Sequence, residues 1–185
     1  MSTAYVIGGA SPQLVPEFCA ATVADADAIA CLVNKAYRPA GAERGWTHEA
    51  DLVASDRTSA AQVAGLLRPG SSVLLLLIDG TIAACVHVEC AEDACRIGML
   101  ATEPKWQNLG LGKRLLEQAE RFAVDVWSAR CLLMSVLSSR PELLAFYERR
   151  GYARTGERTA YPTEAGVGRP KREDIHVLHL EKPAL

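Results

Sequence analysis

The sequence predicts an α/β fold, in which a central twisted mixed sheet is flanked by helices. Apolar runs of strand length alternate with amphipathic stretches of helical period, and an Asp-Gly pair separates two neighbouring runs. No apolar run approaches the ~20 residues that span a membrane. The chain has 185 residues, a length that suits one domain. We therefore assign residues 13–185 to a single domain and residues 1–12, which contain paired glycines, to a flexible leader.

The first elements are expected to be a short strand at residues 17–21 and a helix over 22–38. Thr22 and Asp25 have the spacing of a capping box, with Asp in place of Glu. Residues 39–52 mix Gly, charge and Trp without period, which predicts a loop leading into a short helix capped by Thr47. Thr58 is expected to cap the next helix, through residue 68, with Val63, Leu66 and Leu67 facing inward.

Residues 72–78 and 81–90 are expected to form a hairpin around Asp79 and Gly80. Asp-Gly suits a two-residue turn in which both positions have positive φ. Strict alternation then places two sets of side chains on opposite faces of the second strand: Ile82, Ala84, Val86, Val88 and Cys90 on one, and Thr81, Ala83, Cys85, His87 and Glu89 on the other. A turn at 91–94 leads to a third strand at 95–102.

Two glycines, Gly110 and Gly112, begin an amphipathic helix that extends to about residue 127. Glycine at a helix start costs up to ~1 kcal/mol relative to alanine, so a close approach to the backbone is expected to offset that cost. The free N–H groups and the dipole of a helix N-terminus form an anion site. Neither the dinucleotide fingerprint nor the Walker loop matches the spacing, since both need residues absent here.

The C-terminal part is expected to contain a buried strand at 131–137, a helix over 141–151 and strands at 152–159 and 174–182. Pro at the first turn of that helix and Gly just past its end are the usual asymmetry. Residues 164–174 are expected to be a loop whose Arg169, Lys171 and Arg172 are solvated. His176 and His179 fall on opposite faces of the last strand and are read as ordinary strand residues.

The pattern Q-x-x-G-x-G at residues 107–112 resembles the pyrophosphate-binding motif of the GNAT acetyltransferase superfamily. The resemblance extends over roughly residues 17–160 and includes the segment SVLSSRPELLAFYERRGYARTGE. It implies the acyl-CoA N-acyltransferase fold and acetyl-CoA as co-substrate, without a metal. It further implies that the pantetheine arm pairs with the backbone of Leu100, Ala101 and Thr102. The pyrophosphate would meet the N–H groups of Gln107, Asn108, Leu109, Gly110, Leu111, Gly112 and Lys113.

By the same resemblance Tyr147 matches the tyrosine that acts as general acid, unless it only packs beneath its helix. The family often has Glu on the strand before the motif, but CRIGMLAT contains no carboxylate. Glu89 and His87 on the neighbouring strand are candidates for the base, acting directly or through water, or are purely structural. Glu49 is a candidate for the base or for acceptor binding, and Trp46 for an acceptor platform, against plain capping and core roles.

These observations predict an N-acetyltransferase that acts on a primary amine of a small molecule or peptide, by direct attack in a ternary complex. The alternative is a non-catalytic acyl-CoA sensor on the same fold. The net charge of −2 gives no general attraction to nucleic acid or anionic membranes. Six cysteines without a C-x-x-C pair indicate reduced thiols and a cytoplasmic location. Both a monomer and a homodimer remain open.

Overall fold

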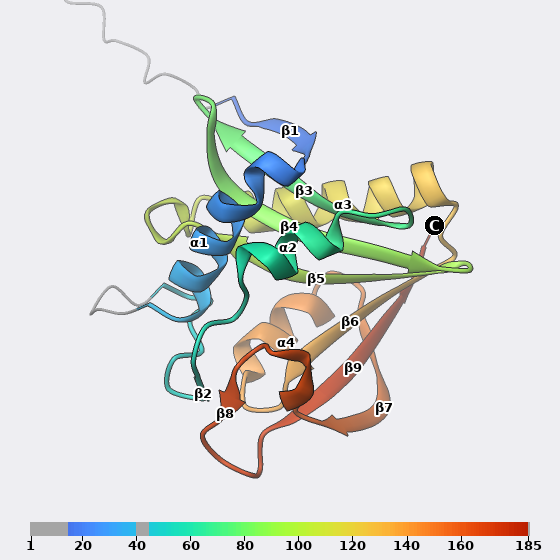
Figure 1. The fold of residues 1–185 in the computed structure, drawn as a ribbon. Helices are drawn as coiled ribbons and strands as arrows, with labels where there is room; N and C mark the ends of the chain where they lie inside the picture. Colours follow the sequence, from blue (N-terminus) through green and yellow to red (C-terminus); the bar gives the residue numbers. More distant parts are fainter. Residues whose placement is uncertain (1–14, 40–44, 185) are drawn as a thin grey trace, which may run out of the picture.

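A seven-stranded mixed sheet forms the centre of the protein (Figure 1). The structure is a computed structural model and describes residues 15–39 and 45–184. The strand order is β1-β3-β4-β5-β6-β9-β7, and only the β5–β6 pair is parallel. The strands are β1 Glu17–Ala20, β3 Ser71–Ile78, β4 Thr81–Ala91, β5 Ala94–Thr102, β6 Cys131–Leu137, β7 Ala153–Ala160 and β9 His176–Pro183. The predicted mixed α/β sheet is confirmed, and the expected leader at 1–12 lies outside the described residues.

Helices cover both faces of the sheet. The helices α1 Ala26–Tyr37 and α2 Ala60–Leu66 pack on one face, and α3 Leu111–Trp127 and α4 Pro141–Glu148 on the other. Figure 1 shows α1 and α2 in front of β3–β5 and α3 behind them. Each helix buries an apolar stripe, such as Leu115, Leu116 and Ala119 of α3, all fully buried. Burial of such side chains contributes about 1.5–3 kcal/mol each and holds the layers together.

Local capping agrees with the expectation at one helix and differs at another. The Asp25 carboxylate accepts a hydrogen bond from the Thr22 N–H at 2.8 Å, as predicted, and a 3₁₀ turn at Val23–Asp25 leads into α1. Ser59, and not Thr58, caps α2 through a reciprocal pair of bonds with Gln62. Thr58 is instead buried, and its N–H donates to the side chain of Asn34 on α1.

The short helix expected after Thr47 is absent from the described residues 45–52, which form turns. The N–H groups of Leu52 and Val53 both donate to the Glu49 carbonyl, and the Glu49 N–H donates to Tyr37. The loop is therefore tied to the end of α1 rather than wound into a helix. It leads to β2 Val53–Ala54, which pairs with β8 Arg169–Pro170 from the predicted C-terminal loop.

The β3–β4 hairpin turns at Asp79 and Gly80 with φ of 49° and 71°, as predicted. The expected strict alternation along β4 is wrong, because Leu76 faces Ala84 while Leu77 faces Ile82. This bulge leaves Ala83 without a paired residue on β3. The side chains before Ala83 therefore point to the opposite face of the sheet from the one that strict alternation predicts. Ile82 consequently packs on the side of α1 and α2, whereas Ala84, Val86 and Val88 belong to the cluster beneath α3.

The β5 and β6 strands separate soon after they begin. Their pairing covers Ala94–Arg96 against Cys131–Leu133 and then stops, so Figure 1 shows the two strands meeting at one end and diverging toward the other. A register shift against β4 and a φ of 50° at Met99 bend β5 in the same region. The sheet therefore opens in its middle, on the side toward which both strands run.

Two cysteines differ from the expectation of reduced thiols. Cys90 and Cys95 face each other across β4 and β5, with Cα atoms 4.0 Å apart, and form a disulfide. Their partnership depends on the strand register, so a search for C-x-x-C spacing cannot find it. The other four cysteines, Cys19, Cys31, Cys85 and Cys131, are free thiols.

Candidate functional site

Two cavities meet where β5 and β6 separate. The smaller, about 300 Å³, runs along β5 and the N-terminus of α3; we call it the cofactor groove. The larger, about 690 Å³, lies on the α1 and α2 side and extends to β9 and β7; we call it the acceptor cavity. Tyr37, Leu100, Leu143 and Tyr147 line both. A ligand in the groove can therefore present one end to the cavity.

The cofactor groove has a floor of free backbone N–H groups. Gly110 caps α3 with a φ of 76°, a left-handed conformation that favours glycine. The N–H groups from Asn108 to Lys113 have no partner among the described residues, while the N–H of Arg114 already donates to the Gly110 carbonyl. These free donors and the positive end of the helix dipole suit a phosphate or diphosphate.

Gln107 is an exception within the predicted cofactor set. Its N–H donates to the Pro104 carbonyl at 3.2 Å, which leaves it unavailable to a ligand. Its side-chain amide donates to the Thr102 carbonyl at 3.0 Å and accepts from the N–H of Trp46. Gln107 therefore links the motif loop to the loop that carries Trp46, a role in which its side chain rather than its N–H is used.

The groove fits a long ligand that ends in phosphates. A Cβ added at Gly110 would meet no atom of the protein within 4 Å, so the space above it is open. The buried Trp106 Nε1 and Arg150 Nε both lack a hydrogen-bond partner among the described residues and lie in the wall of the groove. A buried polar group without a partner costs about 1–3 kcal/mol. These orphaned donors are what an acceptor-rich ligand such as acetyl-CoA would satisfy.

Tyr147 stands at the junction with a free hydroxyl. Tyr37, Tyr152 and Tyr161 each donate a hydrogen bond, to Leu100, Glu120 and Val167 respectively. The Tyr147 hydroxyl has no partner in the described part of the chain, although the side chain is only 6 % exposed. Burial raises the pKa of this phenol, against the opposing effect of two nearby arginines, so it stays protonated and available as a donor.

Glu49 lies in the wall of the acceptor cavity, as a buried carboxylate between two arginines. Arg38 donates to one oxygen at 2.9 Å, and the Arg140 guanidinium is 3.8 Å from the other. Arg140, only 5 % exposed, also donates to the carbonyls of Trp46, Thr47 and His48. Arg140 thus fixes the loop that carries Glu49.

Trp46 lies in the cofactor groove rather than in the acceptor cavity. Its ring packs against Phe146 at a centroid distance of 5.5 Å. The position expected to form a platform for the acceptor therefore belongs to the wall of the groove. The α4 residues Leu143 and Phe146, which the sequence did not single out, line the groove beside it.

His87 and Glu89 share a strand but have different surroundings. Glu89 lines neither cavity and its carboxylate pairs with Arg68, which lowers its pKa chiefly through that hydrogen bond. His87 lines the acceptor cavity, and its Nε2 is 2.8 Å from Ser71 Oγ. Because Ser71 uses its proton on the Leu66 carbonyl, His87 must donate from Nε2, which leaves Nδ1 as an acceptor. Burial lowers the pKa of His87, so the ring is neutral at pH 7.

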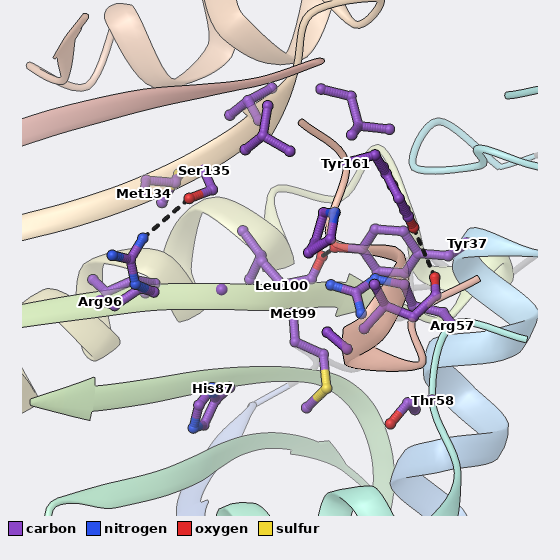
Figure 2. A pocket seen from close by; sticks show the side chains of 18 of the residues that line it. Tyr37, Arg57, Thr58, His87, Arg96, Met99, Leu100, Met134, Ser135 and Tyr161 are labelled. Carbon is purple, nitrogen blue, oxygen red and sulfur yellow. Dashed lines mark hydrogen bonds between the residues drawn. The ribbon is translucent and has the colours of Figure 1, made fainter. Parts of the chain in front are cut away.

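Polar side chains from four adjacent strands extend across the floor of the acceptor cavity. Arg96 on β5 donates to Ser135 on β6 at 3.1 Å, and Ser135 lies 3.3 Å from Nδ1 of His179 on β9. Nε2 of His179 lies 2.9 Å from Thr159 on β7. Figure 2 shows Arg96 and Ser135 on one side of the cavity, and Arg57, Tyr37 and Tyr161 on the other. His179, read as an ordinary strand residue, is part of this wall, and no local signal marks it.

Within the described residues, no group of three or more His, Cys, Asp or Glu side chains is placed to hold a metal ion. No helix in the described ranges is both long and apolar enough to cross a membrane.

Comparison with known proteins identifies a matching domain model and solved structures with the same fold. A sequence model of the acetyltransferase (GNAT) domain matches residues 69–154, the span from before β3 into β7. No match was found among the curated proteins. Solved structures share the fold at low identity, and the ribosomal-protein-S18-alanine N-acetyltransferase from Escherichia coli superposes with a TM-score of 0.69 at 19 % identity over 92 % of this chain and 94 % of that chain.

Two further structures extend the comparison. A nourseothricin acetyltransferase has a TM-score of 0.63 at 18 % identity, over 92 % of this chain and 99 % of its own. A protein from Bacillus anthracis, solved in complex with acetyl coenzyme A, has a TM-score of 0.53 at 17 % identity, over 64 % of this chain and 65 % of its own. At these identities the likeness establishes the fold.

Proposed function

We propose that the chain is an acetyl-CoA-dependent acyltransferase that acetylates a primary amine of a small molecule or peptide, and the match of residues 69–154 to the acetyltransferase (GNAT) domain model supports this proposal. The observation that carries this proposal is the free hydroxyl of Tyr147, buried where the cofactor groove opens into the acceptor cavity. A purely structural tyrosine would be expected to have a partner, as the three other described tyrosines do.

The chain divides the binding of acetyl-CoA between backbone and side chains. The N–H groups of Asn108, Leu109, Gly110, Leu111, Gly112 and Lys113 would hold the diphosphate. The edge of β5 at Leu100, Ala101 and Thr102 would pair with the amide groups of the pantetheine arm, since β6 has diverged there. The carbonyls of Leu100 and Thr102 already accept from Tyr37 and Gln107, so they would accept from the ligand through their second lone pair. Trp106 and Arg150 would supply the side-chain donors. The thioester would then lie at the junction, beside Tyr147.

In the reaction, the neutral acceptor nitrogen forms the new amide bond and releases one N–H proton to solvent, as the carbon–sulfur bond of the thioester breaks. Tyr147 donates its proton toward the leaving sulfur. Its raised pKa makes complete transfer unfavourable in isolation, so the phenol acts by tight placement, and solvent restores its proton afterwards. The amine must first lose its own proton to a base.

We assign that base to His87, acting through water. Its Nδ1 is an unprotonated acceptor, and its lowered pKa keeps it neutral at physiological pH. Glu49 is the competing candidate, but both of its oxygens already face guanidinium groups. Glu89, outside both cavities, is the least favoured of the three.

A pH profile separates these bases. If His87 is the base, kcat/KM falls as the pH drops through its pKa, below the usual imidazole value of about 6.5 because burial disfavours the cation. His87→Gln would remove this limb. If the limb persists in His87→Gln and disappears in Glu49→Gln, the base is Glu49.

The function itself is tested by CoA release from acetyl-CoA in the presence of a broad panel of primary amines. Amine-dependent release, with the acetylated product identified by mass spectrometry, supports the proposal. Tight binding of acetyl-CoA without turnover of any amine would favour the non-catalytic sensor instead. We propose a cytoplasmic location on the four free thiols, against which the Cys90–Cys95 disulfide counts, and cell fractionation tests it. Gel filtration decides between monomer and homodimer.

A further inference from the structure

The charged side chains that line the acceptor cavity are unequally balanced. Arg57 and Arg96 contribute two positive charges, and Glu49 is the one carboxylate among the lining residues that the structure describes. The charge of Glu49 is already opposed by Arg38 and Arg140. The cavity therefore presents an excess of positive charge to whatever enters it.

Arg57 has no carboxylate partner in the described ranges. Its backbone N–H is fixed by Asn34 on α1 at 2.8 Å, and its guanidinium lies over the ring of Tyr37 at 5.7 Å. Tyr37 lines both cavities, so this contact brings the Arg57 guanidinium close to the junction. Figure 2 shows Arg57 directed toward Tyr37 and Leu100.

Arg96 lies on the other side of the cavity and, within the described residues, forms no ion pair, although the charge of its cross-strand neighbour Glu89 acts on it. Its cross-strand neighbour Glu89 gives its carboxylate to Arg68. Ser135 accepts from Arg96, and its Oγ lies 3.3 Å from Nδ1 of His179, whose Nε2 lies 2.9 Å from Thr159 Oγ1. A guanidinium has five N–H donors, so Arg96 retains donors for a ligand.

We propose that the amine acceptor also carries an anionic group, a carboxylate in the simplest case, which the positive charge of Arg57 and Arg96 attracts and one of the two guanidinium groups binds. The acceptor class is then that of amino acids and related amino carboxylates. A guanidinium binds a carboxylate through two parallel hydrogen bonds, and such charge-assisted bonds are roughly twice as strong as neutral ones. An acceptor without an anion would leave both arginines facing its positively charged amine, and this repulsion would weaken its binding.

This inference rests on the proposed function and is tested by matched acceptors. Each amino acid of a panel is compared with its C-terminal amide and with the amine that lacks the carboxylate. We expect kcat/KM to be about tenfold or more higher for the acid, which corresponds to one charge-assisted contact of 1.4 kcal/mol. Equal or better turnover of the amides overturns the inference and leaves the acetyltransferase function intact. If no acceptor of any series is consumed while acetyl-CoA binds, the function itself fails, and the inference with it.

Variants of the arginines assign the preference to these side chains. Arg57→Gln and Arg96→Gln should each reduce the acid-to-amide ratio, mainly through KM for the acid. The control is Arg172→Gln, an exposed arginine that pairs with Asp174 and lines neither cavity, and it should leave the ratio unchanged. A ratio that stays at the wild-type value in both Arg57→Gln and Arg96→Gln overturns the assignment.

Discussion

The cofactor groove and the acceptor cavity adjoin, yet they are formed by different parts of the chain. One continuous stretch, from Leu100 on β5 to Lys113 on α3, supplies the open strand edge and the N–H groups of the groove. The acceptor cavity collects side chains from α1, α2, the loop before α2 and five strands. The N–H groups of one local stretch would bind what all CoA esters share, whereas side chains gathered from distant segments can vary with the acceptor.

The largest expected effect is a loss of acetyl-CoA affinity from a substitution in the cofactor groove alone. Gly112→Val places a branched side chain among the free N–H groups of α3 and should weaken acetyl-CoA binding at least about 100-fold, or about 2.7 kcal/mol. The fold should survive, because the added Cβ would lie 3.4 Å from Thr102 Oγ1. Calorimetry measures the binding, and circular dichroism checks the fold.

A helical glycine outside the groove provides the control for this prediction. Gly65 lies on α2, and a Cβ there would meet nothing within 4 Å. Gly65→Val should bind acetyl-CoA like the wild type. Normal binding by Gly112→Val would show that the groove does not hold the phosphates as we propose.

The next effect concerns the junction that the two cavities share. Tyr147→Phe should lower kcat about 100-fold, the lower range for loss of a general acid, and leave the affinity for acetyl-CoA unchanged. Tyr152→Phe is its matched control, since Tyr152 is also buried but bonds Glu120 and lines neither cavity. The control should lose about 1 kcal/mol of stability and no activity. Equal kcat in the two variants would remove Tyr147 from the mechanism.

A smaller effect on activity should come from the loop that borders both cavities. Arg140→Ala removes a buried cation from three loop carbonyls and from Glu49, which should cost about 3 kcal/mol of unfolding free energy. KM should rise for the acceptor more than for acetyl-CoA. Urea denaturation measures the stability, with the exposed Arg149→Ala as a control that should stay within about 0.5 kcal/mol of wild type. A wild-type midpoint for Arg140→Ala would contradict this role.

The smallest effect should come from the cap of α2, a helix that lines the acceptor cavity, and should be a loss of stability. Ser59→Ala removes the helix cap and should cost about 1 kcal/mol in thermal or urea unfolding. Thr58→Val keeps the volume of the buried neighbour and should cost less than about 0.5 kcal/mol. A larger loss of stability in Thr58→Val than in Ser59→Ala would mean that Thr58, as predicted from the sequence, caps α2.

The same contrast explains what could be predicted from the sequence. Asp79-Gly80, the helix after Gly110 and Pro141 before α4 are local signals, and each indicates its structure without knowledge of the fold. Thr58 and Ser59 both have capping side chains, and only the contact with Asn34 on α1 decides between them.

The acceptor side could not be predicted because it depends on register and long-range packing. The bulge at Ala83 reverses the facing of β4 without any glycine or proline to announce it. Arg57 and His179 become neighbours of one cavity only after strands far apart in the sequence have paired. No local sequence signal marks Arg140, because the three carbonyls to which it donates come from a loop more than 90 residues earlier in the chain.

The early divergence of β5 and β6 has a consequence for the stiffness of the molecule. Among the described residues, three residue pairs join β1-β3-β4-β5 to β6-β9-β7, so we expect a narrow hinge between the two halves of the sheet. A CoA ester bound along the edge of β5 would add hydrogen bonds to one half. Amide hydrogen exchange near the divergence should then slow as the acetyl-CoA concentration rises, so that the stiffness of the sheet would follow the occupancy of the groove.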